Sequence, residues 1–238
     1  MASEKYKEFA SQLKTYMADR LGEDGYRLVD EVNLTYESRH SDYTDFITLY
    51  TGEDERQKRY SSMIECFRRI EILENYWETY KQTPLKIQGL TPYTLVANAY
   101  ERDKATFAQK NVTRVEIPYE AYSISQIGEG HIGYWKNRFK PWLDRFSNIM
   151  TLNSEINRTV ENLKGPINNN GAWFYKMIIA KLAGSPIYEQ IYNTYKSKLE
   201  KALEQEAGTE TIRDYLWVTE QLHAKLEEVK PLENPGLI

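Results

Sequence analysis

The stretch YSSMIECFRRIEILENYWETY, residues 60–80, decides the fold class that the sequence predicts. Apolar side chains recur in it every three or four residues, and it contains neither Gly nor Pro. Such spacing places one apolar face on an α-helix and leaves the opposite face in water. The positions concerned are Tyr60, Met63, Phe67, Ile70, Leu73, Trp77 and Tyr80. A similar pattern in residues 212–229 indicates that amphipathic helices continue into the C-terminal part of the chain.

Outward from this stretch, Gly, Asn and Pro residues interrupt the helical pattern at intervals, as they do at helix ends. Residues 26–50 fit either a short helix or a strand. The other segments are predicted helices, and they cover residues 3–21, 54–83, 91–110, 134–163, 172–183, 185–207 and 209–230. The predicted fold class is therefore all-α, an irregular multi-helix bundle.

One segment departs from the helical pattern. Val115, Ile117 and Tyr119 alternate with polar residues, which is the period of a strand, and a Gly-rich sequence follows them. We therefore predict a short extended, β-like arm around residues 112–127, inside an arm and hinge region at 111–133.

The predicted domain organisation is simple. Residues 1–230 are expected to form a single helical body, from which the arm projects. Residues 231–238 contain two prolines and are expected to form an extended C-terminal tail.

Composition excludes several classes of protein. The net charge of −4 argues against nucleic acid as the partner, because such binders normally show a basic balance or a basic face. No run of about 18 apolar residues occurs, so no segment is expected to span a membrane. The N-terminal MASEKYKEF has no apolar core, so we expect a cytoplasmic or virion protein that is not secreted. The single cysteine, Cys66, lies within residues 60–80 and is predicted to be a core residue.

Gly128, Gly130 and Gly133 match the G-x-G-x-x-G spacing of phosphate-binding loops. That chemistry needs a strand before the glycines and a helix start after them, within βαβ units. The chain shows no run of βαβ units, so we interpret the glycines as a hinge.

Two E-x-x-H pairs, Glu37–His40 and Glu220–His223, are the candidates for metal chemistry. On helices this spacing places a carboxylate and an imidazole on one face, and di-iron bundle proteins combine two such pairs with two more Glu. Further acids at Glu71, Glu74 and Glu78 lie toward the charged side of their predicted helix. A helical-bundle metal-dependent enzyme is therefore kept as an alternative, while the main expectation is no metal, no cofactor and no catalytic residue.

The segment YWKNRFKPWLDRF, residues 134–146, interleaves aromatic and basic side chains. It suits three roles: core aromatics with surface cations, a protein interface rich in Trp, Tyr and Arg, or a strip that stacks single-stranded bases. We predict a protein interface, and a nucleic-acid-associated helical protein remains an alternative. The predicted partner-binding residues, with the apolar end of the tail, are Tyr134, Trp135, Lys136, Arg138, Lys140, Trp142, Arg145, Leu237 and Ile238.

Aromatic stripes, a projecting arm and a Pro-containing tail together indicate an assembly role, since such segments reach and dock on neighbouring subunits. We expect a non-enzymatic structural protein that acts through protein–protein contacts in a homo-oligomeric assembly, with no small-molecule substrate and no membrane partner. At the level of architecture, a small acidic helical body with extended segments resembles the head-to-tail connector or ring proteins of tailed bacteriophages, which implies a virion component.

Overall fold

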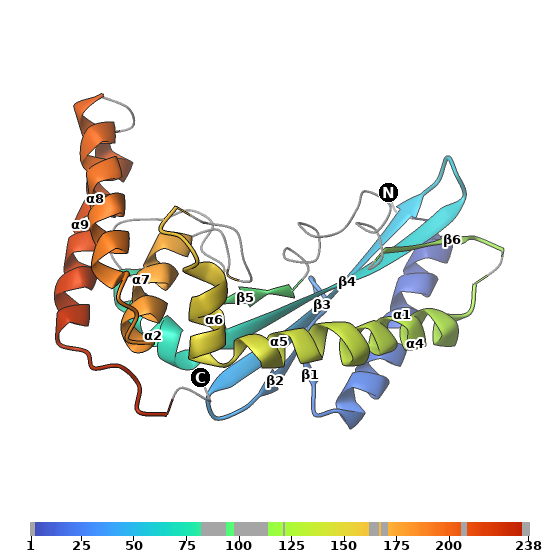
Figure 1. Cartoon of the computed structure of the whole chain (residues 1–238). Helices are drawn as coiled ribbons and strands as arrows, with labels where there is room; N and C mark the ends of the chain where they lie inside the picture. The colour runs from blue at the N-terminus through green and yellow to red at the C-terminus, as the bar shows by residue number, and fades with distance from the viewer. Residues whose placement is uncertain are drawn as a thin grey trace. The chain divides into compact units, whose positions relative to one another are not determined.

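The structure is a computed structural model, and the part of the chain that it describes comprises residues 3–81, 94–97, 114–120, 122–161, 167, 171–205 and 209–234. These residues form a mixed α/β protein (Figure 1). The prediction of an all-α bundle is therefore wrong. No described helix is both long enough and apolar enough to cross a membrane.

The chain divides into two compact units. We call Met1–Arg68 with Val96–Asp144 the sheet unit, and Arg69–Leu95 with Arg145–Ile238 the helical unit.

The sheet has the strand order β1-β2-β3-β4-β5, and β6 pairs with β4. The pairs β1–β2, β2–β3 and β4–β6 are antiparallel. The strand bounds are β1 Arg27–Asp30, β2 Thr35–Arg39, β3 Tyr43–Asp54, β4 Arg59–Ile70, β5 Leu95–Val96 and β6 Arg114–Pro118.

Strand β4 occupies the first half of the stretch for which a long helix was predicted, and only the second half forms a helix, α2 (Glu71–Lys81). Every second residue of β4 from Tyr60 to Ile70 is buried, which is the period of a strand with one covered face. Tyr60 and Ile70 belong both to the predicted helical face and to the alternating set. The segment forms a strand because it lies between β3 and β6, where its backbone groups find hydrogen-bond partners across the sheet.

Helix α1 (Glu4–Glu23) packs against α4 (Ile124–Tyr134) in the sheet unit. Both helices also contact the sheet, since the Tyr36 hydroxyl donates to the Lys14 carbonyl and Ser62 bonds to His131. The segment continues through a π-helix, η1 (Trp135–Phe139), into α5 (Lys140–Phe146). A π-helical turn is an uncommon local widening of a helix.

The predicted arm and hinge take a different form in the structure. The alternating residues do form a strand, but that strand is β6, paired with β4. Gly128, Gly130 and Gly133 lie inside helix α4, with no phosphate-binding loop around them. A Cβ on Gly128 would lie 2.3 Å from Cδ1 of Tyr16. This glycine is therefore needed for the close approach of α1 and α4.

The helical unit is built around α7 (Ala172–Leu182), in which nine of eleven residues are buried. Helices α2, α6, α8 and α9 all contact it. Their bounds are α6 Ile149–Ile156, α8 Tyr188–Glu204 and α9 Thr209–Glu227. Helices α7, α8 and α9 correspond to the last three helices that the sequence predicts.

Two buried polar side chains tie this unit together. Lys176 donates from Nζ to the carbonyls of Ile156 and Thr159, at 3.0 and 2.9 Å, and so satisfies backbone acceptors at the end of α6. Burial lowers the pKa of Lys176 to about 8. The Glu74 carboxylate accepts from the Tyr175 hydroxyl at 2.5 Å and from Thr94 at 2.7 Å.

Candidate metal centre

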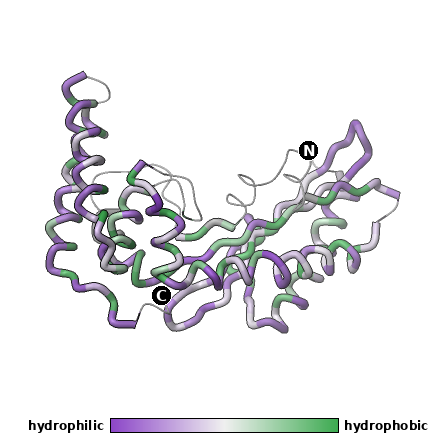
Figure 2. Tube along the Cα trace, viewed as in Figure 1, coloured by the Kyte–Doolittle hydropathy of each residue, from purple (hydrophilic) through white to green (hydrophobic). Residues whose placement is uncertain are grey.

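The helical hairpin of α8 and α9 carries the candidate site. The two helices contact each other, and each buries apolar side chains such as Ile191 on α8 and Leu222 and Leu226 on α9. Hydrophilic residues occupy much of both helices elsewhere (Figure 2). Since His223 and Glu227 are four residues apart on α9, they lie on the same helical face. Glu189 lies in the first turn of α8.

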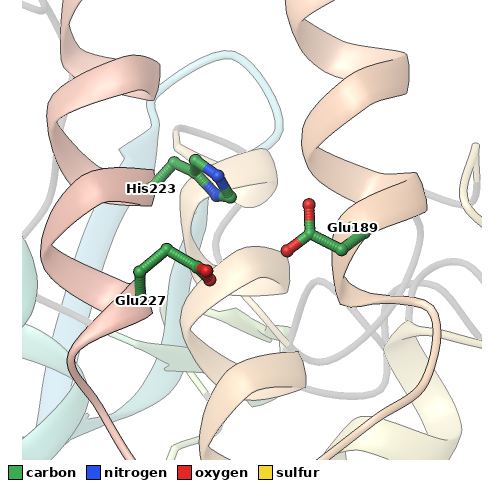
Figure 3. A group of neighbouring side chains, drawn as sticks. All are labelled: Glu189, His223 and Glu227. Atoms are coloured by element: carbon green, nitrogen blue, oxygen red, sulfur yellow. The ribbon is translucent and has the colours of Figure 1, made fainter.

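Glu189, His223 and Glu227 converge in the space between these two helices (Figure 3). Each offers one ligand atom, and all these atoms lie within 4.8 Å of one another. The two carboxylates are exposed and the imidazole is half-buried. Among the described residues this is the group of His, Cys, Asp and Glu side chains with the spacing to hold a metal ion.

The His223 ring is held in place by two tyrosines of α8. The Tyr188 hydroxyl lies 2.8 Å from Nδ1, and the Tyr192 ring stacks on the imidazole with a centroid separation of 3.7 Å. Burial, followed by the charge of Glu227, raises the pKa of Tyr188, which keeps its hydroxyl protonated. For Nε2 to bind a metal ion, Nδ1 must carry the ring proton and donate it to the Tyr188 oxygen, and the Tyr188 hydroxyl can in turn donate to the His223 carbonyl, 3.5 Å away. This is the arrangement of metal-binding histidines, whose second nitrogen is fixed by an outer partner.

The two carboxylates differ in their partners. Glu227 accepts from Nζ of Lys181 on α7 at 2.9 Å, and this hydrogen bond lowers the pKa of Glu227. Within the described residues, Glu189 has no ion pair. Among the residues that the structure describes, the site therefore has one carboxylate that pairs with a lysine and one that has no ion-pair partner.

Imidazole and carboxylate together suit zinc and similar divalent transition ions. Bonds of about 2.0–2.2 Å require the ligands of one zinc ion to lie about 4 Å apart or closer. An ion would therefore require the ligand atoms, which lie within 4.8 Å of one another, to move closer together, and the two Glu side chains are exposed. Three protein ligands would leave one tetrahedral position for water.

The E-x-x-H pairs predicted from the sequence do not form this site. Glu220 pairs with Lys196 at 2.7 Å, while His223 of the same pair joins Glu189 and Glu227. The sequence pattern therefore includes the histidine of this group but pairs it with an acid that lies outside the group. The H-x-x-x-E spacing of His223 and Glu227 was a readable signal, whereas the approach of Glu189 from another helix was not.

The other pair, Glu37–His40, does not lie on a helix, because Glu37 is in strand β2 and His40 comes just after that strand. Glu37 of β2 accepts from Arg27 and Arg39, and these hydrogen bonds lower its pKa against the opposing effect of burial. His40 follows the strand and stacks on Tyr43. Of the further candidate acids, Glu71 pairs with Arg69 and Glu74 lies in the buried network, while the Glu78 side chain is outside the described residues.

The predicted partner-binding strip, residues 134–146, divides into buried rings and surface cations. Trp135 is only 2% exposed and meets Tyr26 edge-on, and Phe139 and Phe146 are buried as well. Tyr134 and Trp142 are half-buried. The Trp135 indole is therefore a core element in this structure.

The cationic side chains of the strip are exposed, and each of them lies beside a carboxylate or over an aromatic ring. Lys136 pairs with Asp24 and Lys140 with Asp144, both at 2.8 Å. Arg138 lies over the Tyr134 ring, and Arg145, in the helical unit, lies over Phe146. The remaining predicted partner-binding residues, Leu237 and Ile238, lie outside the described residues.

Comparison with protein-family models, with curated proteins and with solved structures found no match to this chain. Its function is therefore inferred from the chemistry of its own residues.

Proposed function

We propose that this protein binds a divalent transition-metal ion through Glu189, His223 and Glu227. The observation that supports the proposal is the convergence of two carboxylates on an imidazole whose Nδ1 is already held by Tyr188. Such an imidazole loses little freedom when it binds an ion through Nε2, because its ring is fixed in advance.

The proposed role of the ion is structural. Glu189 lies in the first turn of α8, and Glu227 is the last residue of α9. An ion that bonds to both would therefore join the ends of the hairpin that lie next to α7. Binding would also stabilise the folded helical unit, because an ion that prefers the folded state shifts the folding equilibrium toward it.

Zinc titration tests this proposal. We expect one Zn²⁺ per chain, measured by calorimetry on protein first treated with a chelator. His223→Ala should weaken binding by about 100-fold or more, since loss of an outer-shell partner alone costs about 10- to 100-fold.

The matched control is Glu220→Gln, which removes a carboxylate one turn away on α9 that pairs with Lys196 instead. This variant should bind Zn²⁺ as the wild type does. Absence of binding by the wild type, or equal losses in both variants, would contradict the proposed site.

We also propose that the chain associates with further copies of itself, in keeping with the assembly role expected from the sequence. Strand β1 is the terminal strand of the sheet among the described residues, and Val29 on it is 46% exposed. Val32, just beyond the strand, is 91% exposed. A terminal strand is a template for backbone pairing with another chain. The resemblance to phage connectors depended on an all-helical body and loses that support.

Light scattering during gel filtration tests this association. We expect a dimer that becomes a monomer in the double variant Val29→Lys/Val32→Lys, because lysine on an edge strand opposes pairing of two edges. Met150→Lys replaces another exposed apolar side chain, on α6 in the helical unit, and should leave the mass unchanged. A monomeric wild type would refute the association.

A further inference from the structure

We infer that Lys181 acts as a built-in competing cation that weakens metal binding at the site of Glu189, His223 and Glu227. The inference rests on the proposed metal-binding function and concerns how the affinity of that same site is set.

Lys181 contacts one proposed ligand, Glu227, and also Tyr188, the residue that positions another proposed ligand. Its Nζ lies 2.9 Å from Oε1 of Glu227, and the same ammonium lies 4.8 Å from the centroid of the Tyr188 ring. Tyr188 in turn holds Nδ1 of His223. The Lys181 side chain is only 20% exposed, so water screens its charge less than that of a fully solvated lysine.

When a divalent ion binds, the Lys181 ammonium either stays beside Glu227 or moves away, and both cases weaken metal binding. If the ammonium stays beside Glu227, it repels the ion across a short distance. If it moves away, it gives up the ion pair with Glu227 and the contact with the Tyr188 ring. Glu227 is thus already paired with Lys181 before any ion binds, whereas Glu189 has no ion-pair partner in the described part of the chain.

A positioning role predicts the opposite sign. Carboxylates that bind metal are often oriented by a hydrogen bond from an outer partner. If orientation of Glu227 were the main effect of Lys181, its removal would weaken metal binding. The direction of the change therefore separates competition from positioning.

The test compares Zn²⁺ affinity in the full-length wild type and in Lys181→Met, which keeps the length of the side chain and removes its charge. We expect about a tenfold tighter Kd in the variant, as for removal of one partly screened unit charge beside a divalent ion. The difference in Kd between Lys181→Met and the wild type should become smaller as the salt concentration rises from about 20 to about 500 mM, because salt screens the charge of Lys181.

Two variants serve as controls. Lys181→Arg keeps the charge and should retain the wild-type Kd within about twofold. Lys225→Met removes a lysine of α9 that lies over the Tyr76 ring, and it should leave the Kd unchanged. Circular dichroism checks that each variant is folded.

Each possible result of this comparison either supports or contradicts the proposed competition. Tighter binding by Lys181→Met alone supports competition, and unchanged or weaker binding by that variant overturns it while the metal site itself stands. If neither the wild type nor Lys181→Met binds Zn²⁺, the proposed function fails and the role of Lys181 fails with it.

Discussion

Arg68→Met is expected to destabilise the sheet unit by about 3 to 5 kcal/mol, because it leaves a buried carboxylate without its cation. The Arg68 guanidinium is 1% exposed and bonds to both oxygens of Asp45, at 2.6 and 2.8 Å. It also donates to Asp144 at 3.0 Å and lies over the Tyr43 ring. Asp45, equally buried, has this arginine as its ion-pair partner among the described residues.

Urea unfolding followed by circular dichroism measures this change as a lower midpoint. The double variant Asp45→Asn/Arg68→Met should recover most of the loss, since removing both charges also removes the cost of burying them. Arg59→Met removes an ion pair from the same strand, with Glu116 at 3.5 Å and half-exposed partners. Its expected effect is about 0 to 1 kcal/mol, the range of surface pairs. Equal losses in Arg68→Met and Arg59→Met would contradict the role given to the buried pair.

Acidification is expected to destabilise the sheet unit through His131. This side chain is 2% exposed, and its Nε2 lies 2.8 Å from the Ser62 hydroxyl. Burial lowers the pKa of His131 to about 4, against about 6.5 in an unfolded chain. Between these two values the unfolded chain binds a proton that the folded chain does not, so stability falls as the pH falls. The loss amounts to about 2 kcal/mol by pH 5 and about 3 kcal/mol by pH 4.

Urea unfolding at pH 7 and pH 5 in the wild type and in His131→Gln isolates this contribution. Glutamine stays neutral, so the variant should lose about 2 kcal/mol less than the wild type over that interval. His40→Gln, at an exposed histidine, should follow the wild type. The comparison ends at pH 5 because carboxylates held ionised by partners, such as Glu129 beside Arg20, lose their contribution at lower pH. A wild type and a His131→Gln variant with the same pH dependence would argue against a buried neutral histidine.

Helix positions in the C-terminal part were predictable because each helix is marked by an apolar face or an apolar run and Gly residues separate the helices. The α7 segment, almost uniformly apolar, is followed by Gly184 in the left-handed region with a φ of +63°, a common way for a helix to end. The sheet was not predictable in the same way. Residues 43–50 and 60–70 contain apolar positions that fit both periods, and local spacing alone does not separate them.

The metal candidate shows the same limit on a smaller scale. The E-x-x-H pattern contains His223 but pairs it with Glu220, because along one helix both the preceding and the following turn supply a carboxylate. Packing of α8 against α9 turns Glu220 toward Lys196 and brings Glu189 to His223. A sequence pattern reports which residues share a face of one helix, and it carries no information on which second helix that face will meet.

The aromatic strip at residues 134–146 was predicted to be a protein interface, with core packing and single-strand binding as alternatives, and Trp135 and Phe139 of the strip are buried in the structure. Amphipathic helices, their ends and the chemistry of individual side chains could be read from the sequence, since these follow from interactions between residues a few positions apart. The strand at β4, the buried pair of Arg68 and Asp45 and the convergence of Glu189 on His223 were decided by tertiary structure. Each depends on a partner far along the chain, whose approach is set by the packing of the whole unit.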